Sequence, residues 1–359
     1  MPVGFLFRPI VVTWLYMNYD VFEDRADVPV VGITIGDAAG IGPEISLKAI
    51  ADADLSSICR PVLVGDVGFL KKTSVDLGLN LSFVEFESGR RGLAAEIEVV
   101  DLKNLPENVS LGQDSEVTGR ASAGNIIAAV DLWKAGRLDA IATAPISKKA
   151  ISLGGYDFPG HTEFLAELTG TREFAMSFFA EKLRVVLLST HTSLRNAIEL
   201  VKTDRLVKLI RFSNDQLSKL LGRGVKIAVA GLNPHASEQG MFGSEEADEI
   251  APAIRQCVEL GVDVTGPYSP DTIFLRGFSG EFDAVIACYH DQATIAVKSL
   301  SFGSSVNVTL GLPLIRTSVD HGTAFDIAGK GVADASSMKS AIKLAAGLAN
   351  LRSNQSRFS

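Results

Sequence analysis

The sequence predicts an α/β fold built on a largely parallel sheet. Short apolar segments typical of strands alternate with segments whose apolar residues recur at helical spacing, an order that favours a sheet covered by helices. Polar or glycine-rich segments follow several predicted strands. In open sheets of this type ligands gather at the carboxyl ends of the strands, so these segments are the candidates for a functional site.

Composition narrows the class of protein. The chain has 359 residues, 47% of them hydrophobic and 21% charged, as in a soluble globular protein with room for two domains. A net charge of −8 argues against nucleic acid as the main partner, because phosphate backbones favour a basic face. Three scattered cysteines indicate reduced thiols in a cytoplasm rather than a disulfide framework. No segment is predicted to cross a membrane.

Residues 1–28 differ from the rest. Their apolar run from Phe5 to Leu15 is too short to span a bilayer, and neither a charged start nor a small-residue cleavage site marks a signal peptide. We interpret the segment as an extension, or as the result of a start codon placed too far upstream, with the folded part beginning near Pro29. An interfacial or dimer-covering role stays open.

The first predicted unit is a strand at 30–35, a glycine-rich turn and a helix at 43–51. Pro43 suits the first helical turn, where its missing N–H has no intrahelical partner. The turn Gly36-Asp37-Ala38-Ala39-Gly40-Ile41-Gly42 is neither G-x-G-x-x-G nor a Walker A loop. It is either a tight turn or a loop that lines a ligand.

The following segments continue the alternation. The expected elements are a strand at 61–65, a helix at 66–77, two strands and a loop within 81–110, a helix at 118–135 and a strand at 140–144. Lys148 follows that last strand and is a candidate site residue, although a solvated lysine is the simpler interpretation. Near His161 a turn feeds a helix that Thr162 is expected to cap, with N-terminal amides that suit an anion. A hairpin-like pair at 174–180 and 183–190 follows, then strands at 226–231 and 284–288.

Three histidines share one placement. His191, His235 and His290 each lie just past a predicted strand, and the ends of strands in one sheet converge in space. Three histidines are a usual protein contribution to a catalytic metal site. The pattern therefore indicates a metal site, with structural histidines as the alternative.

Basic and amide side chains lie close to His290 in the sequence. Lys298, Asn307 and Arg316 surround a predicted strand at 306–310. An arginine fork matches an oxyanion, so these residues indicate a phosphate or carboxylate, unless they form surface ion pairs.

Several motifs together resemble the 4-hydroxythreonine-4-phosphate dehydrogenase family over residues 30–349. They are the turn at 36–44, Gly160-His161-Thr162-Glu163-Phe164, Asn233-Pro234-His235-Ala236, Tyr289-His290-Asp291-Gln292 and the segment at 310–324. The resemblance implies a two-domain fold like that of isocitrate and isopropylmalate dehydrogenases, mostly parallel and not a Rossmann fold. The implied domains are 29–150 plus 305–359, carrying an NAD loop, and 151–304, carrying the metal ligands, with the site in the cleft between them.

The resemblance also assigns roles residue by residue. It implies that His191, His235 and His290 bind a divalent metal such as zinc, magnesium or cobalt. The substrate would be held by His161, Thr162, Lys298, Asn307 and Arg316. NAD would lie on the loop from His321 through Gly322 to Gly329, where a carboxylate at Asp326 disfavours the 2′-phosphate of NADP. The family further implies a homodimer with the site at the subunit interface.

The implied reaction oxidises a four-carbon phosphorylated β-hydroxy acid and releases CO2. The substrate of the family's name is 4-phosphohydroxy-L-threonine, which gives 3-amino-2-oxopropyl phosphate in vitamin B6 synthesis. Lys148 and Asp271 are the candidates for the general base, and Asp291 for orienting a ligand imidazole.

The reaction of the family's name is the first expectation. The alternative is a paralogous branch that acts on D-threonate or D-erythronate 4-phosphate and yields dihydroxyacetone phosphate, to which one departure in the sequence points. Gly36-Asp37 replaces a Gly-Glu start, and the segment at 325–331 resembles that branch more closely. Two other classes remain, a phosphotransacetylase-like acyltransferase and a non-catalytic metabolite- or metal-binding module. The three histidines and the loop at 321–329 argue against the acyltransferase.

Overall fold

The computed structural model describes residues 28–51, 54–87, 96–301 and 303–358. The predicted extension at 1–28 lies outside the described residues except for Val28.

The described strands form one sheet in the order β3-β4-β2-β1-β5-β12-β11-β6-β7-β10-β8-β9. The strands are β1 (Val30–Thr34), β2 (Arg60–Gly65), β3 (Ser82–Glu85), β4 (Glu96–Asp101), β5 (Ala140–Thr143), β6 (Ala175–Ala180), β7 (Leu183–Leu187), β8 (Ile227–Ala230), β9 (Val264–Tyr268), β10 (Ala284–Ala287), β11 (Val306–Leu310) and β12 (Ile315–Ser318). Most neighbouring pairs are parallel, so the predicted α/β fold with mostly parallel strands is confirmed.

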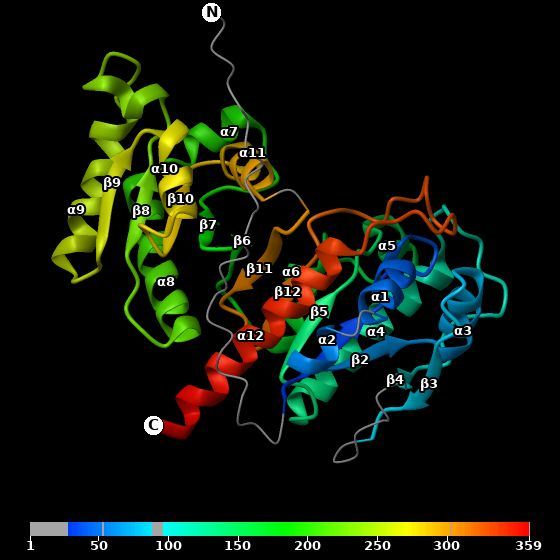
Figure 1. Ribbon diagram of the computed structural model, residues 1–359. Coiled ribbons are helices and arrows are strands. Elements are labelled where there is room, and N and C mark those ends of the chain that lie inside the picture. Colours follow the sequence, from blue (N-terminus) through cyan, green and yellow to red (C-terminus); the bar gives the residue numbers. More distant parts are fainter. Residues whose placement is uncertain (1–27, 52–53, 88–95, 302, 359) are drawn as a thin grey trace, which may run out of the picture.

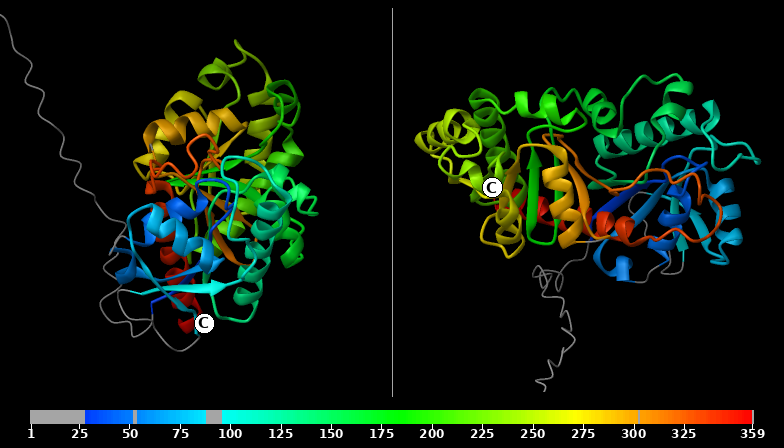
Figure 2. Two further views of the ribbon diagram at one scale, coloured as in Figure 1. Left: turned by 90° about the vertical axis from the view of Figure 1, so that its right-hand side faces the viewer. Right: turned by 90° about the horizontal axis from the view of Figure 1, so that it is seen from above.

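The antiparallel pairs stand together in the middle of the sheet. They are β12–β11, β11–β6 and β6–β7. The parallel group from β3 to β12 therefore runs opposite to the group from β7 to β9. Because adjacent strands rotate by about 20–25°, the four steps from β5 to β7 turn the sheet by about 80–100°. Figures 1 and 2 show the two groups as lobes on either side of β6 and β11.

Helices cover both faces of the sheet (Figure 1). They are α1 (Gly42–Ile50), α2 (Asp54–Ile58), α3 (Val67–Asp76), α4 (Glu116–Lys134), α5 (Lys148–Leu153), α6 (His161–Thr169), α7 (Leu194–Glu199), α8 (Thr203–Leu221), the short helical segments η2 (Pro234–Glu238) and η3 (Glu246–Ile250), α9 (Ala251–Glu259), α10 (Pro270–Phe278), α11 (His290–Leu300) and α12 (Ser336–Phe358). No helix among the described residues is long and apolar enough to cross a membrane.

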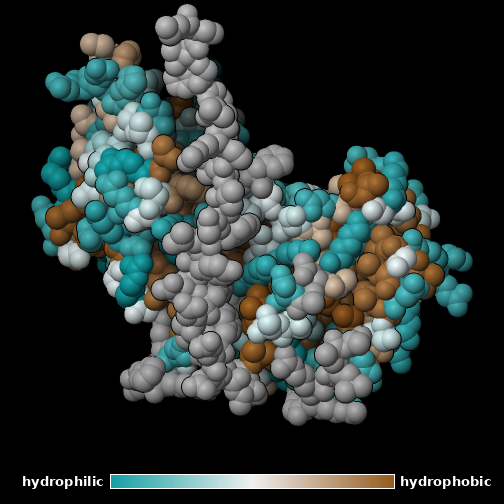
Figure 3. Space-filling view, viewed as in Figure 1, coloured by the Kyte–Doolittle hydropathy of each residue, from teal (hydrophilic) through white to brown (hydrophobic). Residues whose placement is uncertain are grey.

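Apolar side chains alternate along the strands and feed a core on each face of each lobe. In the first lobe α1 and α12 bury one face, and α4 and α6 bury the other. In the second lobe α8 and α9 cover one face and α10 and α11 the other. Leu220 of α8 and Leu344 of α12 pack against cores of both lobes, which joins them on that side. On the face shown in Figure 3, polar and apolar residues are interspersed.

The glycine-rich turn after β1 packs tightly against two other loops. A Cβ at Gly36, whose φ is +69°, would lie 2.3 Å from the carbonyl oxygen of Pro145. A Cβ at Gly40 would lie 2.8 Å from that of Thr323, and the amide of Ile41 donates to the same oxygen at 3.0 Å. Close approach of backbone to backbone therefore explains these glycines.

Candidate active site

The three candidate metal ligands follow three neighbouring strands. β10 lies between β7 and β8 and is parallel to both, so their carboxyl ends form one continuous edge. His191 follows β7, His290 opens α11 after β10, and His235 lies in η2 after β8. The pattern of histidines past strand ends thus corresponds to one edge of the sheet.

Two of these histidines are close together. The rings of His191 and His290 have centroids 5.8 Å apart. Desolvation lowers the pKa of His191, and the charge of Lys148 and the neighbouring His290 lower it further. A lowered pKa favours the neutral imidazole, which is the form that binds a metal. His290 Nδ1 lies 3.3 Å from Asp291 Oδ1, so Asp291 reaches the ring it is expected to orient.

His235 stands apart from this pair. It begins a left-handed stretch, with φ of +53°, and its nearest recorded ring is that of Phe242, 6.5 Å between centroids. Among the described residues no three His, Cys, Asp or Glu side chains form a group that could hold a metal. The donors fit a divalent metal in type and in strand origin, and the structure assembles two of the three.

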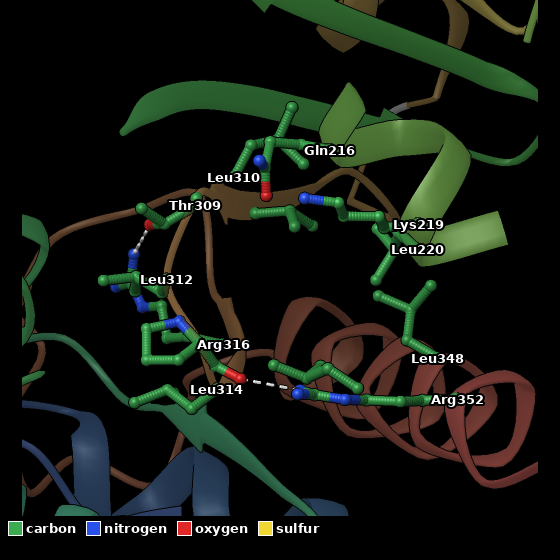
Figure 4. A pocket seen from close by; sticks show the side chains of 14 residues that line it. Gln216, Lys219, Leu220, Thr309, Leu310, Leu312, Leu314, Arg316, Leu348 and Arg352 are labelled. Atoms are coloured by element: carbon green, nitrogen blue, oxygen red, sulfur yellow. Dashed lines mark hydrogen bonds between the residues drawn. The ribbon is translucent and has the colours of Figure 1, made fainter. Parts of the chain in front are cut away.

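Arg316 on β12 is a buried cation among neutral partners. Its side chain donates to Thr143 Oγ1 from Nη2 at 2.9 Å and from Nε at 3.2 Å. Nη1 donates to Thr309 Oγ1 at 3.1 Å (Figure 4) and to Asn307 Oδ1 at 3.4 Å. The residue is 4% exposed, and burial lowers the pKa of the guanidinium to about 10. No ion pair between described residues includes it, although the charge of Glu163 acts on it at longer range and favours its protonated form.

His161 and Thr162 open α6 beside this cation. Burial and the charge of Arg316 hold the pKa of His161 well below its usual value, and its buried Nε2 has no hydrogen-bond partner. The Thr162 hydroxyl lies 3.3 Å from Thr309 Oγ1. The expectation that Thr162 caps the helix is wrong. Gly160 occupies the N-cap and offers no side-chain acceptor, while Thr162 already lies inside the first turn, where it cannot act as the cap.

The two candidate bases differ in surroundings. Lys148 is exposed at the start of α5, and its charge acts on His191, so the loop after β5 reaches the histidine pair. Asp271 is exposed at the start of α10 and accepts a hydrogen bond from Ser269 Oγ at 2.6 Å.

Lys298, a candidate substrate-binding residue, is exposed in the last turn of α11. At 1.5 Å per residue it lies about 12 Å along the helix from His290.

The loop predicted to hold the cofactor follows β12. His321 is half-buried, with Nδ1 3.0 Å from the carbonyl oxygen of Gly322, and Asp326 is exposed. Through Thr323 the loop contacts the turn after β1, and the amide of Gly112 donates to Ala39 in the same turn. The turn after β1, the loop after β12 and the segment that carries Gly112 therefore meet at the carboxyl end of β1.

Two residues of the Arg316 environment were missed by the sequence reasoning. Thr143 ends β5, and its position at a strand end was a usable signal. Thr309 lies inside β11, and only its hydrogen bond with Arg316 of the neighbouring β12 reveals its role.

The chain is similar to known proteins along most of its length. A family model described as pyridoxal phosphate biosynthetic protein PdxA matches residues 57–345. The D-threonate 4-phosphate dehydrogenase of Cupriavidus necator is 44% identical over 328 residues, 90% of this chain and 98% of that protein. Among solved structures, a 4-hydroxythreonine-4-phosphate dehydrogenase from Burkholderia phymatum is 44% identical with a TM-score of 0.79, covering 89% of this chain and 98% of that one. A second, from Klebsiella pneumoniae, is 40% identical with a TM-score of 0.82, covering 89% and 99%.

With a family model matching most of its length and relatives at 40–44% identity along nearly their whole chains, the protein belongs to the PdxA family.

Proposed function

We propose that the protein oxidises and decarboxylates a four-carbon hydroxy acid phosphorylated at its end, with NAD as hydride acceptor. D-Threonate 4-phosphate is the first candidate substrate. The named relatives make the chain an oxidoreductase acting on a CH–OH group. The observation that carries the substrate class is Arg316, a buried guanidinium whose hydrogen-bond partners are all neutral and on which the charge of Glu163 acts without a direct ion pair.

A cation in this state calls for an anionic ligand. Burying a charge without a counter-ion is costly, and hydroxyl and amide oxygens compensate only part of that cost. A phosphate accepts two hydrogen bonds from one guanidinium fork and also neutralises it. Neutral His161, with a free buried Nε2, and the first-turn amides of α6 add donors for the remaining oxygens. We assign this cluster, with Thr162, Asn307 and Lys298, to substrate binding.

The metal ligands are His191, His290 and His235. Their imidazoles would hold a zinc, magnesium or cobalt ion beside the substrate. Such an ion supplies Lewis-acid stabilisation of the oxyanion that develops as the hydroxyl is oxidised and CO2 departs.

Lys148 is the stronger candidate for the general base. Its charge acts on His191, so it lies near the histidine pair, whereas Asp271 is held by Ser269. In its neutral amine form, Lys148 Nζ would take the proton from the hydroxyl that is oxidised.

The cofactor site is assigned to the loop of His321, Gly322 and Asp326. Asp326 is exposed and so available to accept from a ribose hydroxyl, and its charge would repel a 2′-phosphate. NAD is therefore the expected acceptor.

Two observations favour D-threonate 4-phosphate over the substrate of the family's name. The Cupriavidus relative is named for that activity, and the match covers 98% of its length. The Gly36-Asp37 start departs from the Gly-Glu of the vitamin B6 enzyme. 4-Phosphohydroxy-L-threonine remains the second candidate, because the solved relatives carry its name at 44% and 40% identity.

We further propose a cytoplasmic homodimer with its site at the subunit interface, and two domains, 29–150 plus 305–359 and 151–304. These domains correspond to the lobes except that α6, within 151–304, packs in the first lobe. The reduced state of all three buried cysteines is consistent with that compartment.

The test is the requirement for phosphate. Purified protein should reduce NAD with D-threonate 4-phosphate but not with D-threonate, and Arg316→Gln should lose most of this discrimination. Equal turnover of the two substrates would contradict the assigned anion site.

A further inference from the structure

We propose that three buried side chains, Ser189, Gln292 and Glu246, position the three candidate metal ligands. The inference rests on the proposed metal site. Each of the three side chains forms a hydrogen bond to main-chain atoms within three residues of one histidine. Together these bonds link the ends of β7, β10 and β8. We refer to them as the positioning residues.

Gln292 joins the ends of β10 and β8. Its Oε1 accepts from the amide of Cys288 at 2.7 Å, and its Nε2 donates to the carbonyl of Gly231 at 2.7 Å. Cys288 lies two residues before His290, and Gly231 follows directly on β8. Because one partner is a donor and the other an acceptor, the carboxamide satisfies both, whereas a methionine side chain would satisfy neither.

Ser189 joins the ends of β7 and β10. Its hydroxyl donates to the carbonyl of Cys288 at 3.0 Å, and the side chain is buried. Ser189 precedes His191 by two residues. Both the amide and the carbonyl of Cys288 are thus hydrogen-bonded by side chains, which fixes the spacing between the segments that carry His191 and His290.

Glu246 holds the segment that leads to His235. Its Oε1 accepts from the amides of Leu232 and Asn233 at 2.8 and 2.7 Å, and its Oε2 accepts from Asn233 Nδ2 at 2.9 Å. The carboxylate is 3% exposed, and its recorded partners are backbone and side-chain amides rather than a cation. The carboxylate therefore holds the backbone at Leu232 and Asn233 in place.

The segment that Glu246 anchors is strained. The five residues from His235 to Gln239 all have positive φ, an arrangement in which L-residues pay a steric cost at each position. Such a turn persists only where its surroundings determine it. The three hydrogen bonds to Glu246 lie at its entrance, so their loss should release the turn and move His235.

The role in metal binding separates this proposal from a general role in stability. A histidine that bears a metal needs its ring at a fixed place, and removal of groups that orient ligands typically costs 10–100-fold in metal affinity. The recorded bonds of the positioning residues end on backbone or on Asn233, so they would act through the histidines rather than on the metal.

The experiment is a titration of the full, metal-stripped chain with Co²⁺, followed by the visible absorption of the bound ion. The variants are Ser189→Ala, Gln292→Met, Glu246→Ala and Glu246→Gln. We expect 10–100-fold weaker binding and an altered absorption band for the first three, and partial rescue in Glu246→Gln, whose amide oxygen still accepts from Leu232 and Asn233.

Matched controls come from the same region. Asp248→Asn removes one negative charge from η3, where the side chain has no recorded partner, and Gln256→Met makes the glutamine change on the exposed face of α9. Both controls should bind Co²⁺ as the unmodified chain does. Urea unfolding of every variant shows whether it folds, and Ser189→Ala, which removes one hydroxyl, carries the test if Glu246→Ala does not fold.

The outcomes separate the two proposals. A chain that binds Co²⁺ with unchanged affinity and spectrum in all folded variants overturns the role of the positioning residues and leaves the metal site standing. An unmodified chain that binds no Co²⁺ overturns the metal site, and the inference with it.

Discussion

Arg316 Nη2 lies 2.9 Å from Thr143 Oγ1, a hydrogen bond between neighbouring strands β12 and β5 in which a buried cation meets a neutral hydroxyl. The same guanidinium reaches β11 through Thr309 and Asn307. The central strands thus converge on a positive charge that forms no ion pair among the described residues and that Glu163 influences only at longer range, and this arrangement predicts how the protein responds to anions.

Phosphate should stabilise the fold through Arg316. A ligand that binds only the folded state raises the unfolding free energy by RT ln(1 + [L]/Kd), about 2.7 kcal/mol at 100 times Kd. Thermal unfolding with and without a phosphorylated hydroxy acid should show this shift in the unmodified chain and lose it in Arg316→Gln. Arg276→Gln is the control, since that side chain pairs with Glu281 at the surface. An equal shift in both variants would place the phosphate elsewhere.

The same substitution should raise KM. Loss of hydrogen bonds to a charged group costs about 1.5–3 kcal/mol, which corresponds to roughly 10–150-fold. Steady-state kinetics of Arg316→Lys should show a smaller but clear increase, because lysine lacks the bidentate fork. An unchanged KM in both variants is the contrary result.

His161 should make stability fall in mild acid. Its pKa is held well below 6.5 in the folded state by burial and by Arg316, so below pH 6.5 the unfolded chain takes up a proton that the folded chain refuses. The unfolding free energy then drops by about 1.4 kcal/mol per pH unit until the folded pKa is reached. Urea unfolding from pH 7 to pH 5 should give a shallower decline for His161→Asn. Parallel curves would show that His161 titrates normally.

Removal of metal should abolish turnover while the fold persists. His191→Ala and His290→Ala each remove one ring of the close pair, and chelation of the ion should have the same effect. The measurement is NAD reduction before and after chelation, with activity restored by added divalent metal only in the unmodified chain. Full activity of His290→Ala after chelation would refute the assigned ligands.

Substitution of Lys148 is predicted to lower kcat far more than substitution of Asp271. Loss of a general base typically costs 10²–10⁴-fold, so Lys148→Met should fall in that range. Asp271→Asn should stay near the original rate, because its recorded bond is to Ser269 at the surface. The reverse ranking would transfer the role of base to Asp271.

Much of the fold was predictable because strand and helix signals in this chain are local. Alternating apolar runs located β1, β2, β5, β8, β10 and β11, and Pro43 marked the start of α1 within a residue. The antiparallel centre of the sheet was predictable only in part. The predicted hairpin-like pair at 174–180 and 183–190 is confirmed as β6 and β7. The pairing of β6 with β11 and of β12 with β5 was not predictable, because it joins strands more than a hundred residues apart in sequence.

The site divides in the same way. Three histidines past strand ends were visible as a repeated placement, since strand ends carry a sequence signal. The neutral surroundings of Arg316 and the positioning by Gln292 and Glu246 were not visible, because each depends on contacts between segments remote in sequence. The helix at α6 shows a local failure: glycine, not threonine, occupies its cap.

A side-by-side assay of D-threonate 4-phosphate, D-erythronate 4-phosphate and 4-phosphohydroxy-L-threonine as substrates for NADH formation, with CO2 release measured in parallel, tests the proposed reaction. We expect metal-dependent NADH formation with matching CO2 release, fastest with D-threonate 4-phosphate. NADH formation from none of the three by metal-loaded protein would contradict it.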